Sequence, residues 1–530
     1  MKTSGHFPFG MVPLRLWALI ALLIGYGFDA SAADPRPNIL FIAVDDLNDW
    51  IGCMGGHPQT KTPNIDRLAG RGVLFTNAYC AAPVCLASRT AVLCGRYPDQ
   101  TGVYSNWGAT KGKPPAKNLQ LPVYLSANGY ETLGTGKIYH EPKPAYFDDY
   151  FATEQRWSPF TQEQARYTPE ELPTKGTESP RHVVQGGPGA REWILPLNRI
   201  PSERNANGVE GESFDWGPVQ VQDSEMGDSR ITDWARQKLA QPRTKPFFLA
   251  VGYYRPHIPL FAPQQDFDRL PSVEDTQLPA VLQNDLDDIG PIGRKFAHDP
   301  ITAGTHEQVV KYQQWKQAVR SYLACVTFVD RQIGRLLDSL DASPFADNTW
   351  IVLWSDHGWQ LGDKEHWGKW TAWRQTTRMP LIIVPPRQKQ DAARGKPCAD
   401  PVNLVDLYPT VLDICQLPPE DGLSGVSLTP LLKDPDLKTG RAVVTTIDPG
   451  NHAVSMRDWR YIHYHTGEEE LYDIQKDPNE WQNLIADPAH QANAVELRQE
   501  LDKFLKAFGP SKGQAAVNAA PHTGGPKPED

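Results

Sequence analysis

Four apolar runs constrain the fold of this chain more than any other feature. An apolar run without polar alternation indicates a strand buried on both faces of a sheet. The runs are Asn38–Val44, Pro246–Gly252, Trp350–Trp354 and Leu381–Val384. Segments of helical periodicity lie between them, most clearly over 307–341 and again over 402–415. Buried strands that alternate with helices predict an α/β fold with a large, mostly parallel central sheet flanked by helices.

The pattern changes near residue 441, where short, closely spaced strand-like runs follow one another. We expect a smaller C-terminal subdomain built on an antiparallel sheet, with a closing helix near 494–507. Segments 141–220 and 260–305 are rich in proline, glycine and polar residues and are predicted to be long surface loops. The predicted division is a signal peptide (1–33), a main domain (34–440), the C-terminal subdomain (441–508) and a disordered tail (509–530).

The first 33 residues resemble a secretory signal. Lys2 and Arg15 supply the positive flank, Leu16–Phe28 is almost wholly apolar, and Ala30 and Ala32 offer small residues for cleavage. The apolar run is too short to span a bilayer comfortably. We therefore predict export to the periplasm or the medium and no stable membrane insertion after cleavage, with an uncleaved anchor as the alternative. The sequence has no Asn-x-Ser/Thr sequon, which favours a bacterial exported protein.

Charge and cysteine content exclude several classes of function. A net charge of −10 and a pI near 5.8 argue against nucleic-acid binding, which requires a concentrated basic face. The chain has seven cysteines and no Cys-x-x-Cys motif, so neither a redox pair nor a zinc knuckle is indicated. Export permits disulfides, but an odd number leaves at least one cysteine unpaired.

Two of the buried strands are followed by acidic clusters. Asp45 and Asp46 come directly after the first apolar run, and Asp356 and His357 follow the third. A single aspartate after a strand usually caps a turn. Two such clusters repel each other unless a cation lies between them, and carboxylate oxygens suit a hard divalent ion. The sequence therefore predicts a metal site, with Ca²⁺ favoured over Mg²⁺ and some ambiguity introduced by the histidine.

The segment from Cys85 to Arg96 carries a dense motif. Cys-Leu-Ala-Ser-Arg is followed by Gly-Arg six residues after Arg89, and read alone it describes a buried cysteine that opens a helix. The segment resembles the sulfatase signature, Cys-x-Pro/Ala-Ser-Arg followed by Gly-Arg. In that family the cysteine is oxidised to formylglycine by a maturation enzyme, and the aldehyde hydrates to a diol. Ala87 stands where proline is commoner, which leaves the maturation system open.

The resemblance extends over nearly the whole chain after the signal segment. The chain resembles the type I sulfatases of the alkaline phosphatase superfamily, and most of all the iduronate-2-sulfatase branch. Segments 136–140, 247–260, 355–369 and 470–484 match blocks of that family. The resemblance implies a formylglycine derived from Cys85 and a divalent cation held by five residues, namely Asp45, Asp46, Cys85, Asp356 and His357.

The same resemblance assigns catalytic roles. Sulfate ester hydrolysis requires neutralised sulfate oxygens, a strong nucleophile and a protonated leaving group. Lys137 and Lys369 are expected to contact sulfate, and Arg89 to hold the modified Cys85. His257 is the candidate acid toward the leaving oxygen and a substrate contact, and His140 is the candidate base that releases sulfate.

The substrate is constrained less tightly than the reaction. The resemblance implies a sulfated oligosaccharide or polysaccharide, and we expect exo action. Trp107, Trp359 and His452 are candidate sugar contacts, although core packing accounts equally well for the tryptophans. The alternatives are a sulfatase of another carbohydrate or small ester, a phosphate or phosphonate ester hydrolase of the same superfamily, and a non-catalytic glycan-binding protein if Cys85 stays unmodified.

Overall fold

A computed structural model describes most of the chain beyond Pro37. The described residues are 1, 5, 36–106, 109–113, 115–152, 182–185, 191–194, 197–198, 200, 214–299, 304–389 and 393–509. Nearly all of the predicted signal peptide and of the predicted tail, and the candidate sugar contact Trp107, lie outside them. The described residues from Pro37 onward form one compact unit.

An eight-stranded sheet forms the centre of this unit. Its order is β15-β2-β14-β11-β1-β9-β4-β5. Only the pairs that include β14 are antiparallel, so the predicted mostly parallel sheet is confirmed. In sheet order the strands are β15 (Pro397–Cys398), β2 (Val73–Phe75), β14 (Leu381–Val384), β11 (Thr349–Ser355), β1 (Asn38–Val44), β9 (Phe247–Tyr253), β4 (Glu131–Gly136) and β5 (Asp149–Phe151).

The strand register brings four chain segments to one edge of the sheet. Val44, the last residue of β1, pairs with Ser355 of β11 on one side and with Tyr253 of β9 on the other. Gly136 at the end of β4 pairs with Gly252 of β9. Ligand sites of open α/β sheets form outside the carboxyl ends of their strands. The segments that follow β1, β4, β9 and β11 therefore meet at this edge.

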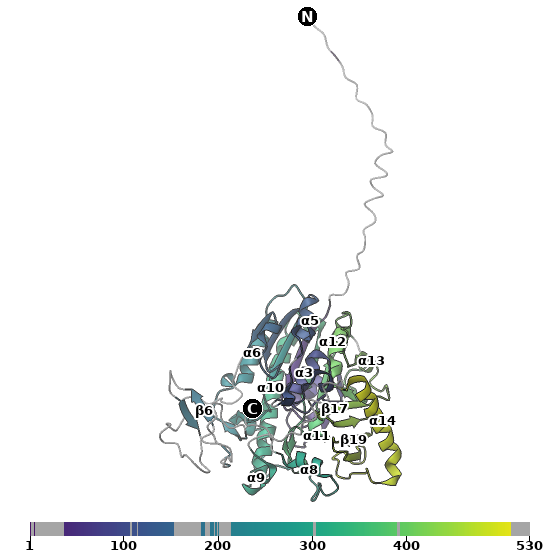
Figure 1. Cartoon of the computed structure of the whole chain (residues 1–530). Coiled ribbons are helices and arrows are strands. Elements are labelled where there is room, and N and C mark those ends of the chain that lie inside the picture. Colours follow the sequence, from purple (N-terminus) through teal and green to yellow (C-terminus); the bar gives the residue numbers. More distant parts are fainter. Residues whose placement is uncertain are drawn as a thin grey trace. The chain divides into compact units, whose positions relative to one another are not determined.

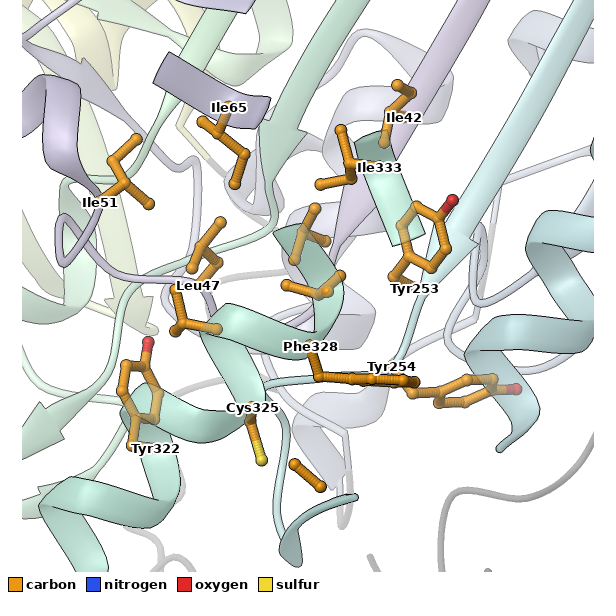
Figure 2. Packing of buried hydrophobic residues seen from close by; sticks show 14 of the residues in the cluster. Ile42, Leu47, Ile51, Ile65, Tyr253, Tyr254, Tyr322, Cys325, Phe328 and Ile333 are labelled. Atoms are coloured by element: carbon orange, nitrogen blue, oxygen red, sulfur yellow. The ribbon is translucent and has the colours of Figure 1, made fainter. Parts of the chain in front are cut away.

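Helices cover both faces of the sheet (Figure 1). Leu40 and Ile42 of β1 pack with α10 (Trp315–Asp341), α6 (Gly227–Leu239) and α2 (Pro63–Ala69). Figure 2 shows Phe328 and Ile333 of α10 in this layer with Ile42. The alternate residues Ile39 and Phe41 pack on the other face. The helices of that face are α3 (Cys85–Cys94), α5 (Leu121–Ala127) and α12 (Leu407–Ile414).

The C-terminal antiparallel sheet is also confirmed. It is a four-stranded meander of β17 (Val443–Asp448), β18 (Asn451–Ser455), β19 (Trp459–His463) and β20 (Glu469–Asp473). Helix α14 (Gln491–Phe508) packs on it through Leu497, Leu501 and Phe504. Thr446 of β17 donates its backbone N–H to Ala81, four residues before α3. The small sheet thus touches the segment that carries the cysteine motif.

The structure corrects four of the predictions, two of helices and two of loop regions. The helix expected over 307–341 is two helices, α9 (His306–Lys311) and α10, separated where Gln313 has a φ of 55°. Over 402–415 a short strand, β16 (Val402–Asn403), and a 3₁₀ turn precede α12. The two predicted loop regions also contain regular structure. It comprises β5, β6 (His182–Gln185), β7 (Arg191–Ile194) and β8 (Trp216–Val219) in the first region, and β10 (Leu260–Pro263), α7 (Gln264–Phe267) and α8 (Pro291–His298) in the second.

Short elements connect these layers. They include β3 (Ala78–Tyr79), α4 (Pro98–Thr101), β12 (Gln360–Leu361), β13 (Trp367–Gly368), α11 (Arg374–Thr377) and α13 (Thr429–Lys433). All seven cysteines belong to the described residues, and none of them forms a disulfide. Among the described residues, no helix combines the length and apolar character of a membrane span.

Candidate active site

The acidic clusters and the cysteine motif meet at the carboxyl edge of the sheet. Asp45 and Asp46 follow β1, Asp356 follows β11, and Cys85 is the first residue of α3. All four side chains are fully buried. One potential ligand atom from each of Asp45, Cys85, Asp356 and His357 lies within 4.8 Å of the others, and Asp45, Asp46, Cys85 and His257 form a second such group. The residues predicted to hold the cation are therefore brought together.

A close approach between two strands places Lys137. Gly136 ends β4 with a φ of +69°, and a Cβ there would lie 2.0 Å from the carbonyl oxygen of Gly252. A Cβ on Gly252 would lie 2.2 Å from the carbonyl carbon of Lys137. Only glycine fits such contacts, and only glycine adopts this φ without strain. The chain can thus turn directly out of β4 and direct Lys137 into the site.

Cations and carboxylates are paired at the centre of the site. Asp45 accepts from Lys137 Nζ at 2.5 Å and from Arg89 Nη2 at 3.1 Å. Arg89 Nε donates to Asp356 Oδ2 at 2.9 Å, and its other terminal nitrogen to the Lys137 carbonyl. Lys369 Nζ lies 3.1 Å from Asp46 Oδ1. The three carboxylates are balanced by three permanent cations, so a divalent ion would make the site positive, as an anionic substrate requires.

Cys85 lies among these positive charges. Its Sγ is 2.9 Å from Lys369 Nζ and 3.4 Å from His357 Nε2. Burial raises the pKa of the thiol, but Lys137, Lys369 and His357, with a hydrogen bond from His140, hold it well below its usual range. These neighbours therefore favour a negatively charged group at position 85 in the folded protein.

The pKa values of Asp46 and Asp356, one from each acidic cluster, are shifted in opposite directions. Burial, reinforced by the charge of Asp45, raises the pKa of Asp46 to about 7 against the pull of Lys369. Burial also raises the pKa of Asp356, but Arg89 outweighs it and the value falls to about 2. Burial lowers the pKa of His357, whereas the Asp356 carboxylate raises it to about 9. Burial thus disfavours the charged form of Asp46, and a cation beside this carboxylate would favour it.

The donor set fits a divalent cation. Asp46 Oδ2 is buried and makes no hydrogen bond, although His257 Nε2 is 3.8 Å away. His357 Nδ1 lies 3.0 Å from the carbonyl oxygen of Gly358, which fixes this nitrogen as the N–H donor and leaves Nε2 for a cation. Carboxylate oxygens and one imidazole are ligands that hard or borderline divalent ions accept.

A network that sequence reasoning missed fixes His257. Its Nδ1 lies 2.5 Å from the carbonyl oxygen of Ile258, so Nε2 points toward Asp46. Asp228 in the first turn of α6 accepts the backbone N–H groups of Tyr254 and Arg255, both at 2.9 Å. Arg255 is buried and donates to the carbonyl oxygens of Phe261 and His257. No sequence motif marks this support, because Asp228 and the loop belong to different elements.

Two of the candidate sugar contacts are buried. Trp359 is 1 % exposed and lies beneath Lys369, whose Nζ is 5.7 Å from its ring centroid. His452 is 2 % exposed, and its Nε2 is 3.1 Å from Asp99 Oδ1. These contacts place both side chains against protein groups, and their role in sugar binding stays a prediction.

Comparison with known proteins identifies the family. The family model described as sulfatase matches residues 37–417, which is more than half of the chain. This chain belongs to the sulfatase family. A second model, described as N-sulphoglucosamine sulphohydrolase, C-terminal, matches residues 362–507 of this sulfatase. It is thus a type I sulfatase of the alkaline phosphatase superfamily and a sulfuric ester hydrolase, as the motifs predicted.

Its relatives include sulfatases from bacteria and animals. A sulfatase of Formosa agariphila is 35 % identical over 90 % of this chain and 86 % of its own length. The iduronate 2-sulfatase of Homo sapiens is 31 % identical over 76 % of this chain and 73 % of its own. The structure of a 2-O GAG sulfatase is 21 % identical with a TM-score of 0.65, covering 92 % of this chain and 99 % of that one. A phosphonate monoester hydrolase of Agrobacterium radiobacter has the same fold, with 19 % identity, a TM-score of 0.66 and coverage of 89 % and 96 %.

Proposed function

We propose that this sulfatase removes O-sulfate from a sulfated glycan, with a formylglycine formed from Cys85 and a bound Ca²⁺ ion. The observation that carries the proposal is the position of Cys85, buried between Lys369, His357 and the three carboxylates. An unmodified structural cysteine has no need of a surrounding that favours its thiolate. The likeness to iduronate 2-sulfatase supports exo action on a terminal uronate 2-sulfate.

The permanent cations would stabilise the sulfate group. The oxygens of a sulfate ester carry negative charge that repels a nucleophile. Lys137 and Lys369, both almost fully buried, offer Nζ donors to these oxygens. Removed from bulk water, each ammonium group interacts more strongly with a sulfate oxygen. Arg89 bridges Asp45 and Asp356, so it would hold both acidic clusters in position during the reaction.

The two histidines would move protons. His257 presents Nε2 to the site, and a proton on this atom can pass to the leaving oxygen of the alcohol. His140 hydrogen-bonds to the side chain at position 85, so it can accept a proton there when sulfate is released.

Two groups would complete the site. A cation bound by Asp45, Asp46, Asp356 and His357 together with residue 85 would supply positive charge for the sulfate and for an ionised nucleophile. Formylglycine at position 85 would supply a hydroxyl nucleophile in place of sulfur.

Mass spectrometry of the peptide that contains Cys85 tests the chemistry. We expect loss of the thiol and reactivity toward a carbonyl reagent in protein from its native host, and no turnover of an aryl sulfate by Cys85→Ala. Cys94, at the other end of α3, provides a matched control, since Cys94→Ala should keep most activity. An intact Cys85 thiol in active protein would contradict the proposal. Faster turnover of an aryl phosphonate monoester than of an aryl sulfate would favour the phosphonate hydrolase alternative.

Substrate and exo action are tested with defined oligosaccharides. We expect sulfate release from the terminal 2-O-sulfated uronate of a disaccharide. Release only from internal units of intact polymer would contradict exo action. The proposal also includes export through residues 1–33, catalysis by residues 34–440 and a supporting C-terminal subdomain over 441–508. N-terminal sequencing of secreted protein would test the cleavage site.

A further inference from the structure

A polar cavity of about 600 Å³ lies at the same edge of the sheet as the active site. It is formed by the segments that follow β1, β2, β15, β18 and β20 together with α11. None of the proposed catalytic or metal-binding residues lines it. The two places share chain segments, because Asp49 follows the metal-site residue Asp46 by three positions and Arg374 follows Lys369 by five.

Most of the charge that lines the cavity is already paired. Arg378 forms an ion pair with Asp49, which also accepts from Gln375 at 3.0 Å. Asp458 accepts from the Gln475 amide. Asp363 accepts the N–H of Leu361 at 3.3 Å, and burial raises its pKa to about 6. The carboxylates of the lining are therefore occupied or partly neutralised within the protein.

Two arginines retain unused donors. Arg374 Nε is buried without a hydrogen-bond partner, and the guanidinium donates only to Asn77 Oδ1 at 3.3 Å among the described residues. No hydrogen bond or ion pair joins Arg457 to any residue of the described chain. Arginine presents a fork of donors that matches the two oxygens of a carboxylate or sulfate. The lining also includes Trp50, Met54 and Ile474, whose apolar side chains suit the C–H groups of a sugar ring.

We propose that this cavity binds an acidic sugar unit of the glycan, with Arg374 and Arg457 holding its carboxylate or sulfate. The choice of ligand rests on the proposed glycan sulfatase function. The volume exceeds the need of a bare anion and lies within the range of small-molecule sites. Binding at a second position would favour longer chains over small sulfate esters, because two contacts on one molecule reinforce each other.

Kinetics on substrates of two lengths test the cavity. Arg457→Gln and Arg374→Gln are compared with Lys503→Gln, which removes an exposed charge from α14 outside the cavity. For a tetrasaccharide that ends in 2-O-sulfated uronate, we expect each cavity variant to raise KM about 10-fold, the loss of one charge-assisted hydrogen bond. The KM for an aryl sulfate, which reaches only the active site, should stay unchanged. Equal KM values for Arg457→Gln and Lys503→Gln on the tetrasaccharide would overturn the proposal.

A binding measurement separates this proposal from the proposed function. Isothermal titration uses an unsulfated uronate tetrasaccharide, which the enzyme does not consume. If the wild-type protein binds this tetrasaccharide and Arg457→Gln weakens the binding, the cavity proposal is supported. A failure to hydrolyse any sulfate ester would refute the proposed function and not the cavity proposal. Hydrolysis of an aryl sulfate without any binding of the tetrasaccharide overturns the cavity and leaves the sulfatase proposal standing.

Discussion

At the residue scale, the orientation of His257 depends on a carboxylate that takes no part in the chemistry. Asp228 accepts two successive N–H groups of the loop that carries this histidine. An asparagine would offer one acceptor and would direct an amide N–H at the second donor. The loop would then shift, and with it the imidazole, while the two lysines proposed to bind sulfate stayed in place.

We predict that Asp228→Asn acts mainly on substrates with poor leaving groups. If His257 protonates the leaving oxygen, kcat should fall roughly 10- to 100-fold for aryl sulfates of weakly acidic phenols and little for strongly acidic ones. The measurement is kcat across a series of phenol pKa values. Asp233→Asn, a partly exposed position of the same helix, should leave the series unchanged. An equal loss for every phenol would indicate a general structural role instead.

Sequence reasoning identified residues that the structure brings together in the candidate site, but not those that hold them in position. Cys85 can be identified from its motif, and the acidic clusters from their positions directly after predicted strands. Asp228 is separated by 26 positions from the N–H that it binds, and such contacts arise only in the folded chain. For the same reason, the burial of Trp359 and His452 was not predictable, since both residue types occur equally in sugar sites and in cores.

At the element scale, the junction of β4 and β9 depends on the absence of a side chain at Gly136. We predict that Gly136→Ala destabilises the protein by roughly 1–3 kcal/mol more than Gly440→Ala. Both glycines have a positive φ, but a Cβ on Gly440 meets nothing within 4 Å. The difference therefore reports the clash of a Cβ with the Gly252 carbonyl and the Ile231 side chain. Urea unfolding of the two variants measures it, and equal losses would contradict the argument.

Asp330 of α10 makes stability depend on pH. It binds the first turn of α2, accepting Ile65 N–H at 2.8 Å, while burial raises its pKa to about 6. A raised carboxyl pKa gives stability that is fully present below the unfolded value and is lost as pH rises through about 6. Asp330→Asn should reduce the fall in unfolding free energy between acidic and neutral pH by about 2–3 kcal/mol.

Urea titrations at pH values on either side of this pKa test the prediction. Asp338→Asn, an exposed position of the same helix paired with Arg67, is the control and should keep the wild-type pH dependence. An unchanged pH dependence in Asp330→Asn would show that another group is responsible.

The order of elements was predictable where the apolar runs are long, and the details were not. A buried run such as Leu381–Val384 is equally apolar in a parallel and in an antiparallel strand. The antiparallel direction of β14 could therefore not be predicted from its sequence. The break between α9 and α10 interrupts a continuous periodic pattern at Gln313, and glutamine is not a residue type that indicates a turn.

At the scale of the whole molecule, a divalent ion should stabilise the fold as well as the site. The ion would join β1, β11 and α3 through buried side chains. A ligand bound only by the folded state adds about 4 kcal/mol at a thousandfold excess over its Kd. We predict that chelation lowers Tm and that Ca²⁺ restores it more fully than Mg²⁺. Asp46→Asn should lower the response to chelation, and an identical Tm with and without chelator in the wild-type protein would contradict the assignment.

The burial of α3 has a consequence for the order of events in the cell. Every residue of this helix is buried, and Cys85 is 0 % exposed. A maturation enzyme has to surround a thiol in order to oxidise it, and the closed fold leaves no room for that encounter. If Cys85 is oxidised as proposed, the oxidation must therefore precede folding. A chain that folds first would keep its thiol, so the yield of active enzyme would depend on a race between modification and folding.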